Sequence, residues 1–171
     1  MNEIIVRPLT HADISAVAEV VVVAWQVAYR QILPDALLDN LSIAQAEQRW
    51  LERIEEPDKA TFVAELNARV VGFVRCGPSR DGDDDPSQIG EIYAIYVHPD
   101  HWGQGVGRAL LSAANQHLRQ RGFTQVTLWT LSDNSSARAF YKKAGLTLDG
   151  ATKVTERGGE MSVEVRYRQL L

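Results

Sequence analysis

A strand, a glycine-rich turn and a helix follow one another between Glu91 and Leu111, and this run constrains the fold more than any other part of the sequence. Its first residues, 91–97, are rich in β-branched and aromatic side chains, which suit a half-buried strand. Pro99 ends that strand, because proline cannot donate to a sheet and restricts the residue before it. Glycine then occupies positions 103, 105 and 107, and apolar residues take helical spacing from Arg108 onward.

This arrangement predicts a phosphate-binding turn. Glycine accepts positive φ and lets a ligand come close to the backbone. The first amide groups of the following helix have no partner within the helix and carry the positive end of its dipole, so they suit an anion. The turn is not a P-loop, because no Lys-Ser/Thr pair follows the glycines. It also differs from a dinucleotide fingerprint, since Leu110 stands where the third glycine would be.

The rest of the chain alternates between strand and helix patterns. A strand, helix and strand in succession imply a right-handed crossover between parallel neighbours. Short runs with alternating or β-rich residues predict strands at 4–7, 59–65, 69–76, 91–97, 125–131, 146–154 and 161–167, and helical spacing predicts helices at 10–30, 34–41, 42–54, 108–121 and 134–145.

Size and composition predict one soluble domain over residues 1–171. Hydrophobic residues make up 45% and charged residues 23% of the 171 residues, and no repeat or linker divides them. The net charge of −4 argues against a nucleic-acid partner. The longest purely apolar run, Val20 to Trp25, is too short to span a bilayer, and no export leader is visible. Cys76 is the single cysteine and reads as a small core filler. We therefore expect a cytoplasmic protein with no membrane partner.

Two motifs together give this sequence a resemblance to a known family. Trp102-Gly103-Gln104-Gly105-Val106-Gly107 aligns with the pyrophosphate motif Arg/Gln-x-x-Gly-x-Gly/Ala, and Asn134 to Leu146 follows the signature Asn-x-x-Ala-x-x-Phe-Tyr-x-x-x-Gly-Phe. The sequence thus resembles the GNAT superfamily of acetyl-CoA-dependent N-acetyltransferases over nearly its whole length. The resemblance implies an α/β (α+β) fold with a mixed, twisted sheet of about seven strands, four or five flanking helices, and fourth and fifth strands that splay apart. Trp102 departs from the family's usual Arg or Gln, and Leu146 departs from its Phe.

The resemblance also implies how acetyl-CoA, as cosubstrate, would bind. In the family the pantetheine arm lies between the splayed strands, here 91–97 and 125–131. The backbone there would contact the arm at Ile95, Tyr96 and Val97, and the Val97 amide would polarise the thioester carbonyl. Asn134 matches the family asparagine that contacts the arm, and Tyr141 matches the family tyrosine that lies near the sulfur. The phosphates would lie at Gly103, Gln104, Gly105, Val106, Gly107 and Arg108.

The chemistry predicts roles for a few side chains. An alkylamine has a pKa of roughly 10, so attack near neutral pH needs a base. The resemblance places Glu91 where it could bind the acceptor and take its proton through water, with His98 as an alternative base. Tyr141 is the predicted general acid for the leaving thiolate. Trp25 and Tyr29 lie four residues apart in a helical segment and form either core packing or an aromatic wall of the acceptor pocket.

Three functions remain open from the sequence. The first is acetyl transfer to a primary amine of a small molecule by direct attack in a ternary complex. The second is acetylation of an N-terminal or lysine amine of a protein, and the third is a non-catalytic acyl-CoA sensor. The loop 77–88 carries four aspartates and reads as a solvated, mobile loop or as a negative rim for a cationic acceptor. His98 and His101 lack the partners of a metal site, so we expect no metal. A homodimer is possible.

Overall fold

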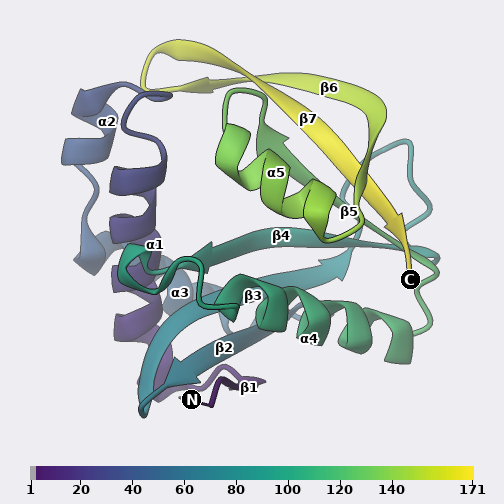
Figure 1. Ribbon diagram of the computed structural model, residues 1–171, viewed down its shortest axis with the longest axis horizontal. Coiled ribbons are helices and arrows are strands. Elements are labelled where there is room, and N and C mark those ends of the chain that lie inside the picture. The colour runs from purple at the N-terminus through teal and green to yellow at the C-terminus, as the bar shows by residue number, and fades with distance from the viewer. Residues whose placement is uncertain (1–2) are drawn as a thin grey trace.

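The structure is a computed structural model that describes residues 3–171, and it is built on one seven-stranded sheet (Figure 1). The strands are β1 (Ile5–Pro8), β2 (Ala60–Leu66), β3 (Arg69–Pro78), β4 (Ile89–Val97), β5 (Gln125–Leu131), β6 (Thr147–Arg157) and β7 (Glu160–Leu170). The helices are α1 (Ile14–Ala28), α2 (Asp35–Asp39), α3 (Ile43–Arg53), α4 (Val106–Gln120) and α5 (Ser135–Lys143), with short 3-10 turns η1 (His11–Asp13) and η2 (Pro99–His101).

The sheet is mixed, in the order β1-β2-β3-β4-β5-β7-β6. Only the β4–β5 pair is parallel, because α4 crosses over between these two strands; every other neighbouring pair is antiparallel. The predicted fold class, with seven strands and five flanking helices, is confirmed.

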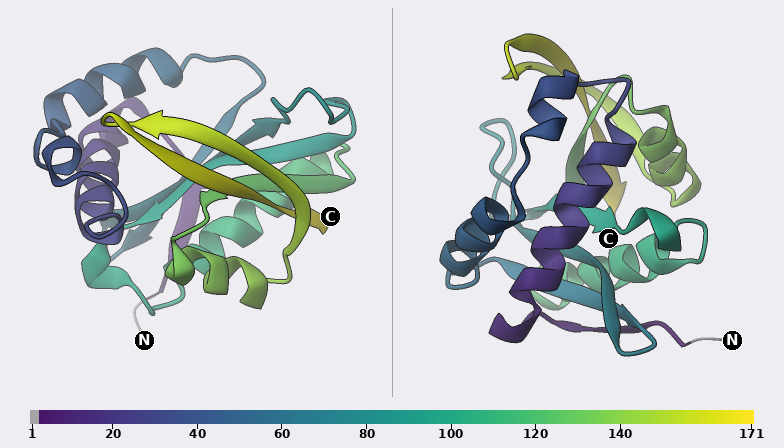
Figure 2. Two further views of the ribbon diagram at one scale, coloured as in Figure 1. Left: turned by 90° about the horizontal axis from the view of Figure 1, so that it is seen from above. Right: turned by 90° about the vertical axis from the view of Figure 1, so that its left-hand side faces the viewer.

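Helices cover both faces of the sheet (Figure 2). On one face α1 and α3 pack on β3, where the rings of Trp50 and Phe73 meet edge to face at 5.0 Å between their centroids. On the other face α4 packs on β2, β3 and β4 through a core that contains Leu110 and Leu118. A Cβ at Gly72 would lie 3.1 Å from Leu110 Cδ1, so glycine in β3 allows α4 to approach closely.

The first helical segment, His11–Ala28, is long and apolar enough by length and composition to cross a membrane. The sequence analysis considered only the uninterrupted apolar run Val20–Trp25, which is shorter than this segment. In this structure the segment is a core helix, because Ile14, Val17, Ala18 and Val20 are buried against α3 and the sheet.

Strands β4 and β5 pair at one end only. Their register runs from Ile89–Gln125 to Ile92–Leu128, and beyond those residues the two strands separate. The register of β4 with β3 shifts between Arg75 and Cys76, which leaves Tyr93 as the extra residue of a β-bulge. The bulge bends β4 at the point where β5 leaves it. The predicted splaying is therefore present, and it leaves a fork between the ends of β4 and β5 (Figure 1).

The loop that joins β3 to β4 is anchored on the neighbouring strands. Arg166 Nη2 on β7 lies 2.7 Å from Asp83 Oδ2, and Arg168 Nη2 lies 2.7 Å from Asp84 Oδ1. Trp129 Nε1 donates to Asp81 at 2.9 Å. These contacts hold Asp81, Asp83 and Asp84 to the neighbouring strands, whereas residues 85–88 are exposed. The predicted solvation is therefore confirmed for part of the loop, and its mobility stays a prediction. The guanidinium groups of Arg166 and Arg168 are shared among Asp81, Asp83, Asp84 and Asp149, so the carboxylates outnumber the cations and the alternative, a negative rim, stays a prediction.

Candidate active site

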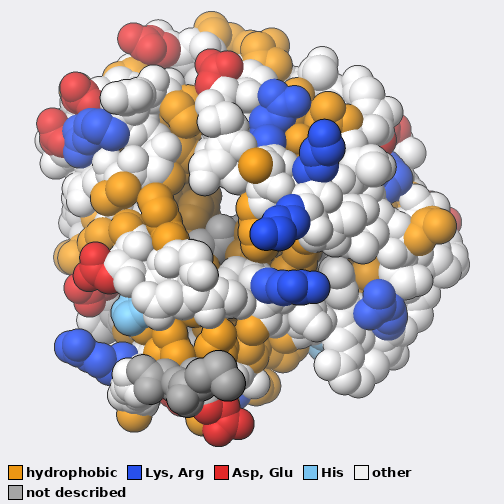
Figure 3. All heavy atoms as spheres, in the orientation of Figure 1, with side chains coloured by type: hydrophobic (Ala, Val, Ile, Leu, Met, Phe, Trp, Pro, Cys, Tyr) orange, Lys and Arg blue, Asp and Glu red, His pale blue; other side chains and the backbone are white. Residues whose placement is uncertain are grey.

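The fork opens into a groove of about 1390 Å³ that crosses the molecule between the helices. Helices α1 and α3 form one wall, α5 and the start of α4 form the other, and β4 and β5 form the floor. Figure 3 shows a hollow at this place, with apolar side chains inside it and several Lys and Arg side chains gathered on one side.

The backbone of β4 turns unpaired amide groups into this fork. The His98 N–H donates to the Val71 carbonyl of β3 at 2.8 Å. Because backbone groups point alternately to either side of a strand, the N–H and C=O of Val97 point the opposite way, toward the fork, and those of Ile95 share that side. Tyr96 instead presents its backbone to β3. Two of the three predicted backbone contacts, Ile95 and Val97, thus have amides oriented for a ligand in the fork.

The glycine turn lies at the end of the fork, where α4 begins. Gly103 and Gly105 have φ of +74° and +88°, so both positions use the left-handed conformation that glycine favours. The first bond of the helix runs from the Ala109 N–H to the Gly105 carbonyl at 3.1 Å. The amides of residues 106–108 precede it and point out of the helix end, and Arg108 adds an exposed charge at the groove. The backbone at the start of α4 is thus arranged in a way that suits an anion, and phosphate binding by residues 103–108 stays a prediction. The Gln104 side chain does not line the groove, and its amide nitrogen donates to the Asp100 carbonyl at 3.1 Å.

Gly107 has a different role from the other two glycines. Its φ is not in the left-handed region, and a Cβ there would lie 3.3 Å from Phe140 Cζ. Gly107 thus lets α5 pack closely, through Phe140, on the first turn of α4.

The Trp102 side chain connects the glycine turn to the end of β4. Its indole Nε1 donates to the Val97 carbonyl at 2.8 Å, although 46% of the residue remains exposed. The side chain at this position therefore holds the turn against the end of β4. The sequence showed only that Trp102 departs from the family's usual Arg or Gln, and it did not predict this bond.

The start of α5 supplies two further groups. Asn134 is buried and caps the helix, with its Oδ1 accepting from the Ala137 N–H at 3.1 Å. Within the described residues its amide nitrogen has no protein acceptor, and Asn134 lines the groove. Tyr141 also lines the groove, is 8% exposed, and its hydroxyl makes no hydrogen bond to another described side chain. Burial raises the pKa of Tyr141, so this hydroxyl keeps its proton at neutral pH.

Glu91 is buried in the floor of the groove and is paired. Its carboxylate accepts from the Arg80 backbone N–H at 2.9 Å, from Arg80 Nε at 3.1 Å and from Arg80 Nη2 at 2.6 Å. The guanidinium also lies over the Tyr93 ring, 4.2 Å from its centroid. A carboxylate has about four acceptor directions, so one remains for a water or an amine. The role of Glu91 as a base stays a prediction, now with Arg80 as its partner.

An aromatic wall faces the fork from α1. The rings of Trp25 and Tyr29 meet edge to face at 5.0 Å between centroids, and the Tyr29 and Tyr96 hydroxyls lie 3.2 Å apart. All three residues line the groove, and Trp25 and Tyr29 also pack against a small buried leucine cluster, so core packing is present and the role as a wall of the acceptor pocket stays a prediction. Tyr96, which was predicted at the cofactor, thus presents its side chain to this wall.

The sequence missed several charged groove residues: Arg49, Arg53, Arg80, Lys153, Arg157 and Glu164. Lys153 and Arg157 alternate with exposed residues on β6, and this alternation was visible in the sequence, but nothing there indicated which face of the strand would turn inward.

The predicted alternative base, His98, accepts from the Asp100 N–H through Nδ1 at 3.3 Å.

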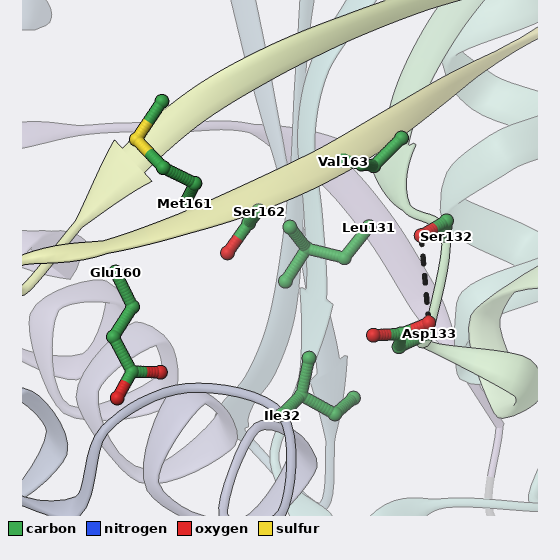
Figure 4. A pocket seen from close by; sticks show the side chains of 8 residues that line it. All are labelled: Ile32, Leu131, Ser132, Asp133, Glu160, Met161, Ser162 and Val163. Carbon is green, nitrogen blue, oxygen red and sulfur yellow. Dashed lines mark hydrogen bonds between the residues drawn. The ribbon is translucent and has the colours of Figure 1, made fainter.

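A second, smaller cavity of about 220 Å³ lies beside the end of β5 (Figure 4). In this view Leu131 and Ile32 extend toward its centre, the Glu160 carboxylate lies to one side, and Ser132 and Asp133 are joined by a hydrogen bond of 3.5 Å. The cavity contains none of the predicted site residues.

Comparisons with known proteins agree with this geometry. Residues 24–146 match the acetyltransferase (GNAT) family. An uncharacterized N-acetyltransferase of Bacillus subtilis, YuaI, is 35% identical over 132 residues, which is 77% of this chain and 73% of that protein. The PaiA N-acetyltransferase of Thermoplasma acidophilum, solved with coenzyme A, superposes with a TM-score of 0.76 at 20% identity over 95% of this chain and 98% of that chain.

A third similar protein is YncA of Salmonella typhimurium, a putative acetyltransferase solved with acetyl-CoA. It superposes with a TM-score of 0.74 at 23% identity, over 99% of this chain and 94% of that chain. The matched family segment covers α4, its glycine turn and most of the groove floor. On this evidence the chain belongs to the acetyltransferase (GNAT) family.

Proposed function

We propose that this protein transfers the acetyl group of acetyl-CoA to a primary amine of a small molecule, by direct attack within a ternary complex. The observation that carries the proposal is the fork, in which the free Val97 amide stands in line with the glycine turn and the open start of α4. The coenzyme A and acetyl-CoA held by two structures of the same fold support this choice of cosubstrate.

The residues of the groove fit such a ligand in their chemistry. The amides of residues 106–108 and Arg108 would hold the diphosphate. The amides of Ile95 and Val97 and the amide nitrogen of Asn134 would pair with the polar groups of an extended arm. Acetyl-CoA supplies an activated acetyl group as a thioester. The Val97 N–H would stabilise negative charge that develops on the acetyl oxygen.

Tyr141 would act at the sulfur. A thiol has a pKa of about 8.5 and a tyrosine of about 10, so full proton transfer from tyrosine to a thiolate is already uphill. Burial raises the pKa of Tyr141 further. The hydroxyl therefore acts first as a hydrogen-bond donor that stabilises the thiolate, and the proton follows as the product leaves.

Direct attack is favoured because no cysteine in the chain is suited to carry the acetyl group. Cys76 is the single cysteine and is fully buried in the core. Burial raises the pKa of its thiol to about 12, so it does not form a thiolate at neutral pH. Glu91, through water, remains the proposed acceptor of the amine proton.

Calorimetry and a thiol-release assay test the proposal together. We expect acetyl-CoA to bind, a panel of small amines to release free thiol, and initial-rate plots to intersect, as a ternary complex requires. Thiol release with peptides alone would move the acceptor to proteins. Tight binding without turnover on any acceptor would identify a sensor, and no binding at all would refute the proposal.

A further inference from the structure

One part of the groove, lined by α3, β6 and the start of the β3–β4 loop, lies apart from the predicted phosphate site, and we call it the acceptor half. It is positively charged, although the chain as a whole carries −4. Its walls hold five cationic side chains and two carboxylates, a balance of +3. The carboxylates are Glu91 and Glu164, and the cations are Arg49, Arg53, Arg80, Lys153 and Arg157. An acceptor bound here meets an excess of positive charge.

Both carboxylates are already engaged by cations of the same wall. Arg80 holds Glu91, as described above. Glu164, which is 7% exposed, lies 3.2 Å from Arg157 Nη2 and 3.8 Å from Lys153 Nζ. One carboxylate thus serves two cations on β6, and this leaves a positive charge without a counterion at that point of the groove.

The strand that carries these cations turns its polar face inward. Along β6, Lys153, Thr155 and Arg157 are half-buried, whereas Val154 between them is 59% exposed. A strand that served packing alone would turn Val154 inward and the long cations to solvent. In this strand the polar residues face inward and Val154 faces outward, so the three polar side chains line the groove rather than the outer surface.

Two polar atoms on this face are buried and unpaired among the described residues. They are Arg157 Nε and Thr155 Oγ1, on alternate residues of one strand. Buried donors are almost always paired in folded proteins. The Arg157 guanidinium also lies over the Trp25 ring at 5.7 Å, and Lys153 Nζ lies over the Trp129 ring at 4.2 Å, so aromatic rings fix the cations at the edge of the acceptor space.

We infer that the acceptor amine carries an oxyanion group, such as a carboxylate or a phosphonate, and that Lys153, Thr155 and Arg157 bind it. The inference rests on the proposed function and names its substrate class as amino-acid-like amines. Arg and Lys donors recognise an oxyanion through charge-assisted hydrogen bonds, and Trp25 and Tyr29 flank its carbon chain. A polyamine or an aminoglycoside would instead place further positive charge beside uncompensated cations.

The test compares acceptors that differ only in that charge. The panel holds amino acids, their carboxamides and methyl esters, aminoalkylphosphonates, short peptides and spermidine, each with acetyl-CoA. We expect kcat/KM for an anionic amine to exceed that of its carboxamide at least about tenfold, the equivalent of one charge-assisted hydrogen bond. The phosphonates distinguish the type of oxyanion. Equal use of acid and carboxamide, or preference for spermidine or peptides, would overturn the inference while leaving acetyl transfer in place.

Three variants connect the preference to β6. Lys153→Met leaves the Arg157–Glu164 pair intact and should raise KM for the anionic amine about tenfold, with the acetyl-CoA Kd unchanged. Arg157→Lys keeps a charge and should lower the preference for acid over carboxamide less than Arg157→Met does. Arg69→Met removes an exposed cation at the start of β3, outside the groove, and should change neither constant. Unaltered KM in Lys153→Met and Arg157→Met would refute the assignment, as would acetyl-CoA binding without turnover of any anionic amine. Absence of acetyl-CoA binding would instead refute the proposed function.

Discussion

Gly105→Ala separates the two properties of the glycine turn, its backbone conformation and its ligand site. Gly105 has φ of +88°, and the nearest atom to an added Cβ is Ile4 Cδ1 at 3.8 Å, an ordinary contact. The substitution therefore introduces backbone strain without a clash. Left-handed geometry costs an alanine about 1–2 kcal/mol, and the lower entropy of the unfolded chain offsets about 0.4–1 kcal/mol of that. We expect a net loss of about 1 kcal/mol in the free energy of unfolding.

Gly122→Ala is the matched control. Gly122 has φ of +90° with no atom within 4 Å of an added Cβ, and it lies beyond the C-terminal end of α4, away from the groove. Both variants should lose about the same stability in urea, and Tm should fall by about 2–4 °C in each. Gly105→Ala alone should raise the Kd for acetyl-CoA at least about tenfold, because it turns the amides of the predicted phosphate site. A wild-type Kd in Gly105→Ala, with the stability loss present, would refute the assignment of that site.

Five further variants test individual side chains. Asn134→Ala and Ser42→Ala each remove a helix N-cap and should each lower stability by about 1 kcal/mol, but only Asn134→Ala should also weaken acetyl-CoA binding in calorimetry. Tyr141→Phe should lower kcat about a hundredfold with an unchanged acetyl-CoA Kd, and an unchanged kcat would remove the hydroxyl from the mechanism. Glu91→Gln should abolish the fall of kcat/KM toward acid pH if Glu91 is the base; an unaltered pH profile excludes that role. Arg7 lowers the pKa of the buried Asp13 to about 2, so this carboxylate stabilises the fold above about pH 4 and loses its contribution as pH falls toward 2. Asp13→Asn should cost about 2 kcal/mol in urea unfolding at pH 7 and well under 1 kcal/mol at pH 2, and an equal loss at both pH values would refute this.

The helices and strands could be predicted well from the sequence, because each has a regular spacing of apolar residues or a residue that clearly ends it. The strand 125–131 was predicted with the bounds that β5 has, since alternating β-rich residues lie between a glycine and a cap-forming cluster. The helix predicted at 42–54 begins where expected, because Ser42 caps it, with its Oγ accepting from the Gln45 N–H at 3.3 Å. These features depend on residues within one or two turns of each other, so a sequence window contains the information.

Contacts between distant segments were not predictable in the same way. Arg166 and Asp83 are far apart in the chain, and only the adjacency of β7 to β5 brings the aspartate loop against β7. The pairing of Glu91 with Arg80 likewise depends on how the β3–β4 loop returns over β4. The inward face of β6 is fixed by its register with β7, in which Lys153 stands opposite Glu164. A shift of one residue would have turned Lys153 outward, and no local signal in the sequence selects between the two registers.

The fork itself is the feature that local preferences alone do not explain. Two neighbouring strands that separate leave backbone amides without partners, and each unmade buried hydrogen bond is unfavourable by about 1–3 kcal/mol. The structure holds the strands apart by three means: the bulge at Tyr93 bends β4, the close contact at Gly107 sets α5 beside α4, and Trp102 occupies the Val97 carbonyl. Trp102 donates to the Val97 carbonyl, while the N–H of the same residue remains open toward the fork. The Trp102 indole is a donor only, so it pairs with the Val97 carbonyl and leaves the Val97 N–H open for the proposed chemistry.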